Sequence, residues 1–267
     1  MAARWPASSQ PTNCHALRPM AHGLICRSRW AVVFDFAGSR GGQHARDFLG
    51  LPGTPARPGW QGKLVCDDFA GYKACFELGV TEVGCMAHAR RKFHEFWANH
   101  GSQVGEQALK FFGQLYEVER VAVNADSQAR LEARRAARPL ADALNQWLRQ
   151  QRQRVPDGSA TAKAMDYSLN RWAALTRYLG DPALPIDNNL DEQQIRPWAT
   201  GRKNWLFAGT LLAGQRAAAI MSLIQTAKLN GHDPYVYLRD VLTRLPHQRA
   251  RDIDALLPHR WTSPAAP

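Results

Sequence analysis

The chain has 267 residues, 45% of them hydrophobic, with 9 Trp and 10 Phe, which excludes a wholly disordered protein and supplies a sizeable core. Lys and Arg number 34 against 23 Asp and Glu, and the resulting formal charge of +11 points to nucleic acid or another anionic surface as partner. No stretch approaches the ~18 uninterrupted apolar residues of a membrane span, so we expect no membrane partner.

The five cysteines are odd in number and irregularly spaced along the chain. This distribution argues against a disulfide framework of the kind that staples small secreted domains. It is typical of a reducing compartment, and we therefore expect a cytoplasmic protein.

Residues 1–29 contain several arginines but no acidic residue, and the first acidic residue of the chain is Asp35. Their apolar residues follow neither a helical nor a strand period. An organelle transit peptide shares the arginine-rich, acid-poor bias, but no amphipathic pattern is present. We expect a disordered or mis-assigned leader here.

The next part of the chain alternates strand and helix patterns. Short β-branched and aromatic runs predict strands at 31–36, 62–66 and 82–85. Helical patterns follow each of them, the last over 87–96. This alternation predicts an α/β layer.

From about residue 102 the pattern becomes helical without further strands. Pro139 and Ser159 lie where new helices can begin. After this segment, Asp187 is a good N-cap for a short helix that we expect Pro197 to end. Two more helices are predicted at 213–229 and 235–245.

Two carboxylates lie at positions that suit metal chemistry. Asp67 follows a predicted strand, where open α/β sheets bind their ligands, and Glu192 lies on the short helix. Carboxylates from separate elements suit Mg²⁺, and two ions about 3.5–4 Å apart can cleave a phosphodiester. Taken singly, however, Asp67 more often caps a strand end and Glu192 more often pairs with Arg196.

Cys85 and His88 lie three residues apart at a predicted strand-to-helix junction. A zinc site would need two further ligands, and no second paired motif supplies them. A histidine bonded near a phosphate or carboxylate is the better functional interpretation, and a structural histidine the simpler one.

Basic residues cluster at 90–92, 130–138 and 196–203. Such runs usually mark solvated faces. The third is interleaved with Trp198 and adjoins Trp205, a combination that suits phosphate contacts with aromatic stacking.

Several motifs occur together in one order: LVCDDFAGY at 64–72, GCMAHARRKF at 84–93, IDNNLDEQQIRP at 186–197, GRKNWLFAG at 201–209, SLIQTAKLNG at 222–231, DPYVYL at 233–238 and LLP at 256–258. Together they resemble the insertion-sequence 66 family of bacterial DDE transposases, from about residue 31 to 261.

The resemblance implies a ribonuclease H-like mixed sheet with a large all-helical insertion and a C-terminal helical tail. It also implies DNA strand cleavage and transfer with Mg²⁺ or Mn²⁺. The expected segments are the leader at 1–29, the core at 30–98, the insertion at 99–183, the closing part of the core at 184–230 and the C-terminal helical segment and tail at 231–267.

By position, Asp67 matches the family's second catalytic Asp and Glu192 its catalytic Glu, both as metal ligands. Cys85 and His88 match a supporting Cys-x-x-His motif. The residues expected to contact DNA are Arg90, Arg91, Lys92, Arg196, Arg202, Lys203 and Trp205. Partners implied are the element's terminal inverted repeats, target DNA, further copies of the chain and accessory element proteins.

The family carries its first catalytic Asp in an upstream Asp-Glu-Thr motif, which is absent here, and Asp35 matches a variable position. Gln193 replaces the Arg usual after the catalytic Glu. We therefore expect an N-terminally truncated transposase with impaired activity. The alternative is a non-catalytic DNA-binding remnant that binds element ends or associates with full-length transposase.

Overall fold

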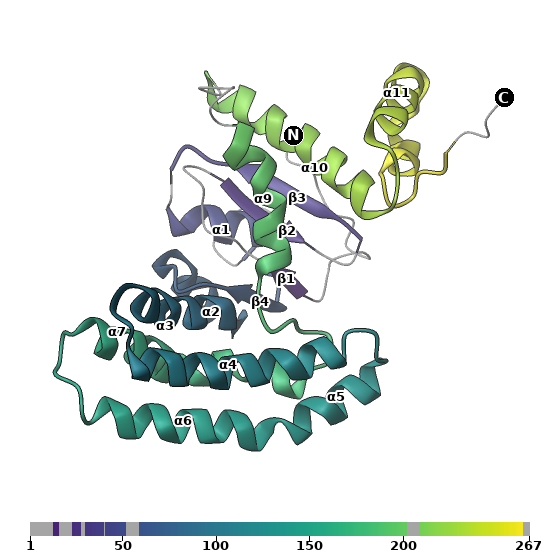
Figure 1. Cartoon of the computed structure of the whole chain (residues 1–267). Helices are drawn as coiled ribbons and strands as arrows, with labels where there is room; N and C mark the ends of the chain where they lie inside the picture. The colour runs from purple at the N-terminus through teal and green to yellow at the C-terminus, as the bar shows by residue number, and fades with distance from the viewer. Residues whose placement is uncertain are drawn as a thin grey trace. The chain divides into compact units, whose positions relative to one another are not determined.

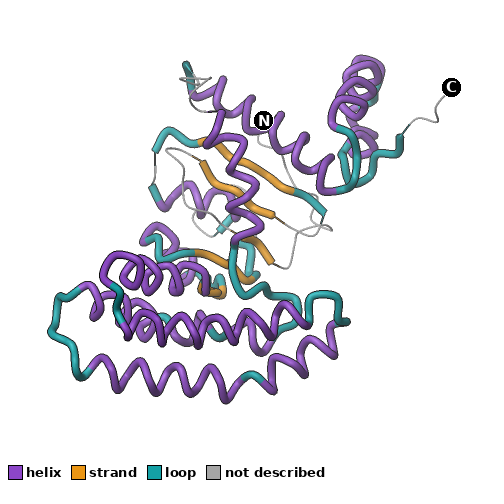
Figure 2. The backbone as a smooth tube through the Cα atoms, viewed as in Figure 1, coloured by secondary structure: helices purple, strands orange, loops and turns teal. Residues whose placement is uncertain are grey.

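The computed structural model describes residues 13–15, 23–27, 30–39, 41–51, 59–201 and 209–263 (Figure 1). The chain divides into two compact units. We call residues 63–68 and 81–189 the insertion unit, and residues 1–62, 69–80 and 190–267 the hairpin unit. Helices dominate both, and the strands are short (Figure 2).

The insertion unit contains two parallel strands and a series of helices. Strand β4 (Lys63–Cys66) pairs with β5 (Thr81–Gly84), with Val65 opposite Val83. The helical elements that follow are α3 (Met86–His100), α4 (Gln103–Val121), α5 (Ser127–Ala136), α6 (Arg138–Arg152), α7 (Ala160–Asn170), α8 (Trp172–Leu175) and the 3₁₀ helix η3 (Arg177–Gly180).

Side-chain caps begin three of these helices. Ser102, Asp126 and Ser159 each accept a hydrogen bond from the backbone N–H three residues on. Each cap satisfies one of the amides that a helix leaves unpaired, which contributes about 1 kcal/mol. Pro139 lies in the first turn of α6, where its missing N–H costs nothing.

A single hydrophobic cluster joins the strands to the helices of the insertion unit. Val65 and Val83 from the strand pair are fully buried, as are Phe112 from α4, Leu144 from α6 and Met165 from α7. Leu64, Val65 and Cys66 of β4 are buried one after another, without the alternation of a half-exposed strand, because helices cover this strand.

The hairpin unit holds an antiparallel strand pair and the C-terminal helices. Strand β2 (Gly23–Arg27) pairs with β3 (Val32–Phe36), with Ile25 opposite Phe34. The other elements are β1 (Asn13–His15), α1 (Gly42–Leu49), η2 (Ala70–Tyr72), α2 (Lys73–Glu77), α9 (Asn189–Gly201), α10 (Leu211–Leu229), α11 (Pro234–Arg244), η4 (Leu245–His247) and η5 (Ala250–Leu256).

Helix α10 runs along β3 and hydrogen-bonds to its backbone (Figure 1). The Thr226 hydroxyl accepts from the N–H of Val32 at 3.0 Å and donates to the carbonyl of Val32 at 3.0 Å. The Ser222 hydroxyl accepts from the N–H of Phe34 at 2.8 Å. Two hydroxyls thus take the place of a neighbouring strand on this edge of β3.

The predicted strands at 31–36, 62–66 and 82–85 correspond to β3, β4 and β5, and the mixed α/β class is confirmed. Strands β1 and β2 lie within residues 1–29, so the expected disordered leader does not describe these two segments. Their residues lack the alternation that reveals a strand, and backbone pairing forms them all the same.

Pro197 does not end the helix that carries Glu192. Helix α9 continues through Pro197 to Gly201. A proline removes one backbone donor and therefore one hydrogen bond, and Ile195 and Trp198 on either side pack against β3 and α10. Tertiary packing thus outweighs the local breaker signal. Within the described residues, no helix combines the length and apolarity needed to cross a bilayer.

Candidate active site

Asp67 lies directly after β4, at the carboxyl end of the parallel strand pair. Its side chain is 7% exposed, and the three strand residues before it are fully buried. The next residue, Asp68, has a side chain that is 59% exposed. The predicted position of Asp67 at a strand end is confirmed, and this is where parallel sheets place ligand-binding groups.

Arg171, which joins α7 to α8, holds the backbone at this strand end. Its Nη2 donates to the carbonyl oxygen of Asp67 at 3.1 Å, and its Nε donates to Oε1 of Glu82 in β5 at 3.0 Å. No local pattern indicates this contact, since Arg171 and Asp67 lie 104 residues apart. It therefore went unpredicted.

Glu192 lies in the first turn of α9 and is half-buried, while its neighbour Asp191 is 1% exposed. The chain enters α9 through a turn built by Asp187, whose Oδ1 accepts from the N–H of Asn189 at 3.0 Å. Since α9 begins at Asn189, Asp187 forms an Asx turn before the helix instead of the predicted cap. The Tyr116 hydroxyl donates to Oδ2 of Asp187 at 2.7 Å and holds this turn.

Cys85 binds the residue after Asp187. Its Sγ donates to Oδ1 of Asn188 at 2.9 Å and accepts from the N–H of Asn188 at 3.5 Å. Burial raises the pKa of the Cys85 thiol to about 12, so the thiol stays protonated and available as a donor. In this structure Cys85 is thus a hydrogen-bond partner of Asn188.

His88, the other member of the Cys-x-x-His motif, is 6% exposed in the first turn of α3. The motif thus lies where β5 meets α3, as the sequence predicted. Its role in supporting the catalytic carboxylates stays a prediction.

The carboxylates of Asp67 and Glu192 are the ligand type that Mg²⁺ and Mn²⁺ prefer. Asp67 belongs to the insertion unit and Glu192 to the hairpin unit. Across the ranges that the structure describes, no group of three or more His, Cys, Asp or Glu residues is arranged to hold a metal. The donor chemistry of the two carboxylates suits a divalent ion.

Three residues predicted to contact DNA form an exposed basic row on α3: Arg90, Arg91 and Lys92. The Lys92 ammonium lies 4.5 Å from the centre of the Tyr167 ring, which is a cation–π contact. Arg196 is exposed on α9.

The other three predicted DNA contacts, Arg202, Lys203 and Trp205, lie outside the described residues.

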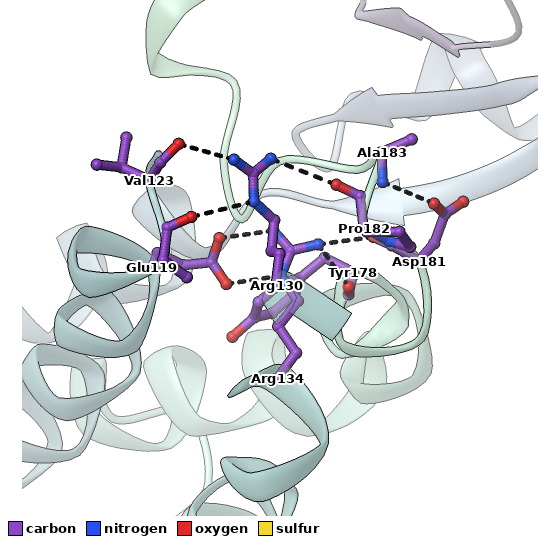
Figure 3. Close-up of polar contacts among 9 residues, drawn as sticks. Glu119, Val123, Arg130, Arg134, Tyr178, Asp181, Pro182 and Ala183 are labelled. Carbon is purple, nitrogen blue, oxygen red and sulfur yellow. Dashed lines mark hydrogen bonds and ion pairs between the residues drawn. The ribbon is translucent and has the colours of Figure 1, made fainter. Parts of the chain in front are cut away.

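The basic run at 130–138 is not uniformly a solvated face. Arg134 is 1% exposed, and its guanidinium binds both carboxylate oxygens of Glu119 at 2.7 and 2.5 Å (Figure 3). Its Nη1 donates to the carbonyl oxygens of Tyr178 at 3.0 Å and Asp181 at 2.6 Å. Arg134 thus holds η3 and the residue that follows it. A fully buried arginine requires a charged partner and satisfied donors, and Arg134 has both.

Arg130, one turn earlier, has the same kind of role in a more exposed place. It donates to the carbonyl oxygens of Val123 at 2.8 Å and Pro182 at 3.5 Å (Figure 3). Of the run expected to be surface charge, these two members hold loops of the insertion unit together.

Comparison with known proteins shows which family the chain is related to. Residues 15–216 match the model of the Transposase IS66 family, and residues 222–259 match the IS66 C-terminal element. The first match begins at residue 15, inside the leader predicted at 1–29. No solved structure matches the chain significantly.

Three uncharacterized proteins of Sinorhizobium fredii are similar to this chain. The protein y4hP is 30% identical over 254 residues, 88% of this chain and 45% of its own length. The protein y4qI is 35% identical over 75% of this chain and 39% of its own length, and y4jD is 33% identical over 86% and 46%. The chain spans about half the length of the curated relatives it matches. With its family match covering most of its length, the chain belongs to the IS66 family of transposases.

Proposed function

We propose that this chain contributes to DNA strand cleavage and transfer by the transposase of a bacterial insertion sequence. The observation that carries the proposal is the buried Asp67 at the carboxyl end of a parallel strand pair, within a segment that matches the transposase family. A ribonuclease H-like arrangement of the core is part of the proposal, and the parallel pair β4–β5 followed by a helical segment is consistent with it.

In this proposal Asp67 and Glu192 are metal ligands, and the ion is Mg²⁺ or Mn²⁺. A divalent ion bound there would supply a nucleophile and stabilise the leaving oxygen at the phosphodiester. The basic residues of α3 and Arg196 would hold the DNA backbone. The proposed partners are terminal inverted repeats, target DNA, further copies of the chain and accessory element proteins, all in the cytoplasm.

The chain as given holds no Asp-Glu-Thr motif. The family resemblance assigns the first catalytic aspartate to that motif, and a missing carboxylate weakens metal binding and misplaces the reacting water. We therefore propose that this chain alone cleaves weakly.

The test is cleavage of a labelled duplex that carries an end of the element, with Mg²⁺, Mn²⁺ or EDTA. We expect cleavage only with metal, stronger when an upstream Asp-Glu-Thr segment is joined to the chain. Asp67→Asn and Glu192→Gln should each lower the rate by about 100-fold or more. Asp126→Asn, a change at an exposed helix cap, is the control. If the extended chain does not cleave, or if Glu192→Gln is silent, the catalytic proposal is wrong.

A second candidate function rests on the exposed row of Arg90, Arg91 and Lys92 and on the net charge of +11. A chain with these properties can occupy element ends without cleaving them. Its signature is duplex binding that needs no divalent metal and weakens steeply with salt. Replacing the three residues by Gln removes roughly 3 phosphate contacts. The slope of the log binding constant against log salt concentration should become shallower by about 0.9 for each contact. Salt-independent binding, or none at moderate salt, would exclude this candidate.

A further inference from the structure

Arg171 is an arginine whose side chain is almost removed from solvent. It lies between α7 and α8, and its side chain is 8% exposed. A charge buried to this extent is costly unless it is paired and its donors are satisfied. The partners that satisfy it therefore show what the residue is for.

Each of the three guanidinium nitrogens has a partner on a different element. Nε and Nη2 donate to Oε1 of Glu82 at 3.0 and 2.5 Å, and Nη1 donates to the Tyr167 hydroxyl at 2.8 Å. Nη2 also donates to the carbonyl oxygen of Asp67 at 3.1 Å. Oδ1 of Asp68 lies 3.7 Å from Nε. The guanidinium of Arg171 thus forms its hydrogen bonds within the protein, unlike that of an arginine whose donors are left to bind a phosphate.

This geometry fixes one particular peptide. The Asp67 carbonyl belongs to the peptide group that joins Asp67 to Asp68, so Arg171 anchors the backbone directly after Asp67 while β4 anchors the backbone directly before it. Glu82 lies in β5, opposite Leu64 of β4. Arg171 therefore links the end of one strand to the body of its neighbour, and it does so from the helical segment.

We propose that Arg171 is a positioning residue for Asp67. It holds the Asp67–Asp68 peptide against β5, and the planar fork of arginine is required because it reaches a carbonyl, a carboxylate and a phenol at once. The functional part of this inference rests on the proposed role of Asp67 as a catalytic carboxylate. A displacement of that carboxylate by about 1 Å is enough to cost ~100-fold in rate.

The experiment compares Arg171→Lys with Arg134→Lys. Arg134 is the matched control because it is also buried, also pairs with a glutamate and also donates to backbone carbonyls, but those carbonyls belong to Tyr178 and Asp181. Lysine keeps the charge at both sites and removes the fork.

Two readouts are local to Asp67. The first is the ¹³C chemical shift of the Asp67 carbonyl, which moves upfield when the hydrogen bond is lost. The second is amide hydrogen exchange at residues 66–69, which we expect to accelerate by about tenfold in Arg171→Lys. Arg134→Lys should leave both unchanged. A third readout is the cleavage of end DNA, for which Arg171→Lys should lose ~100-fold in kcat with KM unchanged.

The outcomes separate this inference from the proposed function. An Asp67 carbonyl that is unmoved in Arg171→Lys overturns the positioning role, whatever the activity. A carbonyl that moves while cleavage by the extended chain is unaffected also overturns it, since the orientation then has no catalytic consequence. If the extended wild-type chain does not cleave at all, the proposed function fails, and the carbonyl shift alone decides whether Arg171 holds the peptide.

A milder variant guards against loss of the fold. Tyr167→Phe removes only the acceptor of Nη1 and leaves the bond to Asp67 in place. We expect a smaller movement of the same carbonyl and a smaller loss of kcat. No movement in this variant, together with unfolding of Arg171→Lys, would identify Arg171 as a general structural residue and overturn the proposal.

Discussion

The two units bury their strands in different ways. In the insertion unit, β4 and β5 lie under a large cluster of fully buried apolar side chains from several helices. In the hairpin unit, the buried members of the cluster on β3 include Val32, Phe34 and Ala218, and two hydroxyls bond the strand edge. β4 and β5 thus rely on a large apolar core, whereas β3 combines a smaller apolar cluster with directed hydrogen bonds.

The largest effect is expected from the core of the insertion unit. Phe112→Ala should lower the free energy of unfolding by about 3–5 kcal/mol, because it removes a fully buried ring and leaves a cavity. Urea denaturation followed by circular dichroism measures this change. Val121→Ala, on the same helix but 73% exposed, is the control and should change it by less than about 0.5 kcal/mol. Equal effects from the two variants would show that the buried cluster does not stabilise the insertion unit in particular.

The hairpin unit should be sensitive to two hydroxyls instead. Replacing Ser222 by Ala and Thr226 by Val leaves the N–H groups of Val32 and Phe34 without their acceptors, at about 1–3 kcal/mol each. Limited proteolysis and hydrogen exchange of β3 measure the loss.

The control for this pair is Thr243→Val on the exposed face of α11, where the hydroxyl bonds within its own helix. It should be close to neutral. Were the Ser222 and Thr226 variants also neutral, the edge of β3 would be held by packing, and the two units would be stabilised alike.

The smallest effect concerns a polar contact of the insertion unit and depends on pH. Burial raises the pKa of the Cys85 thiol from 9.0 to about 12. In the unfolded chain the thiol ionises near pH 9, whereas in the folded chain it stays protonated there. The free energy of unfolding therefore contains the full contribution of Cys85 below pH 9, and this contribution is lost as pH rises toward 12. The expected loss is about 1.4 kcal/mol per pH unit in this window.

The measurement is the free energy of unfolding of wild type and Cys85→Ser between pH 7 and 10.5. Cys66 and Cys75 are present in both proteins, so the difference reports on Cys85 alone. Serine does not titrate in this range, and the difference should therefore shrink as pH rises. A difference that is independent of pH would show that the thiol is not withheld from ionisation.

The features that could be predicted from the sequence are those that depend on residues close together in the chain. Three strands and the helices of the insertion unit were predicted because their apolar periodicity and their caps are local signals, as at Ser159. The position of Asp67 followed from its strand. Strands β1 and β2 were missed because backbone pairing, which no local pattern announces, defines them.

The arginines show the same limit at the candidate site. Arg134 lies in a run that is typical of a solvated face, and its burial depends on Glu119 and on a segment more than 40 residues away. Arg171 reaches Asp67 across 104 residues. Single-sequence patterns do not reveal which charge finds a distant partner, and these two residues became visible only in three dimensions.

The hydroxyl-sealed edge of β3 has a consequence for synthesis of the protein on the ribosome. Phe36 ends β3, and Thr226 is made 226 − 36 = 190 residues later. At a synthesis rate of roughly 5–20 residues per second, about 10–40 s pass between the synthesis of β3 and that of the hydroxyl groups that bond its edge. During that interval its backbone donors are open to other strands, which favours association between nascent chains. A message that ends before residue 222 would make this exposure permanent and should yield an insoluble product.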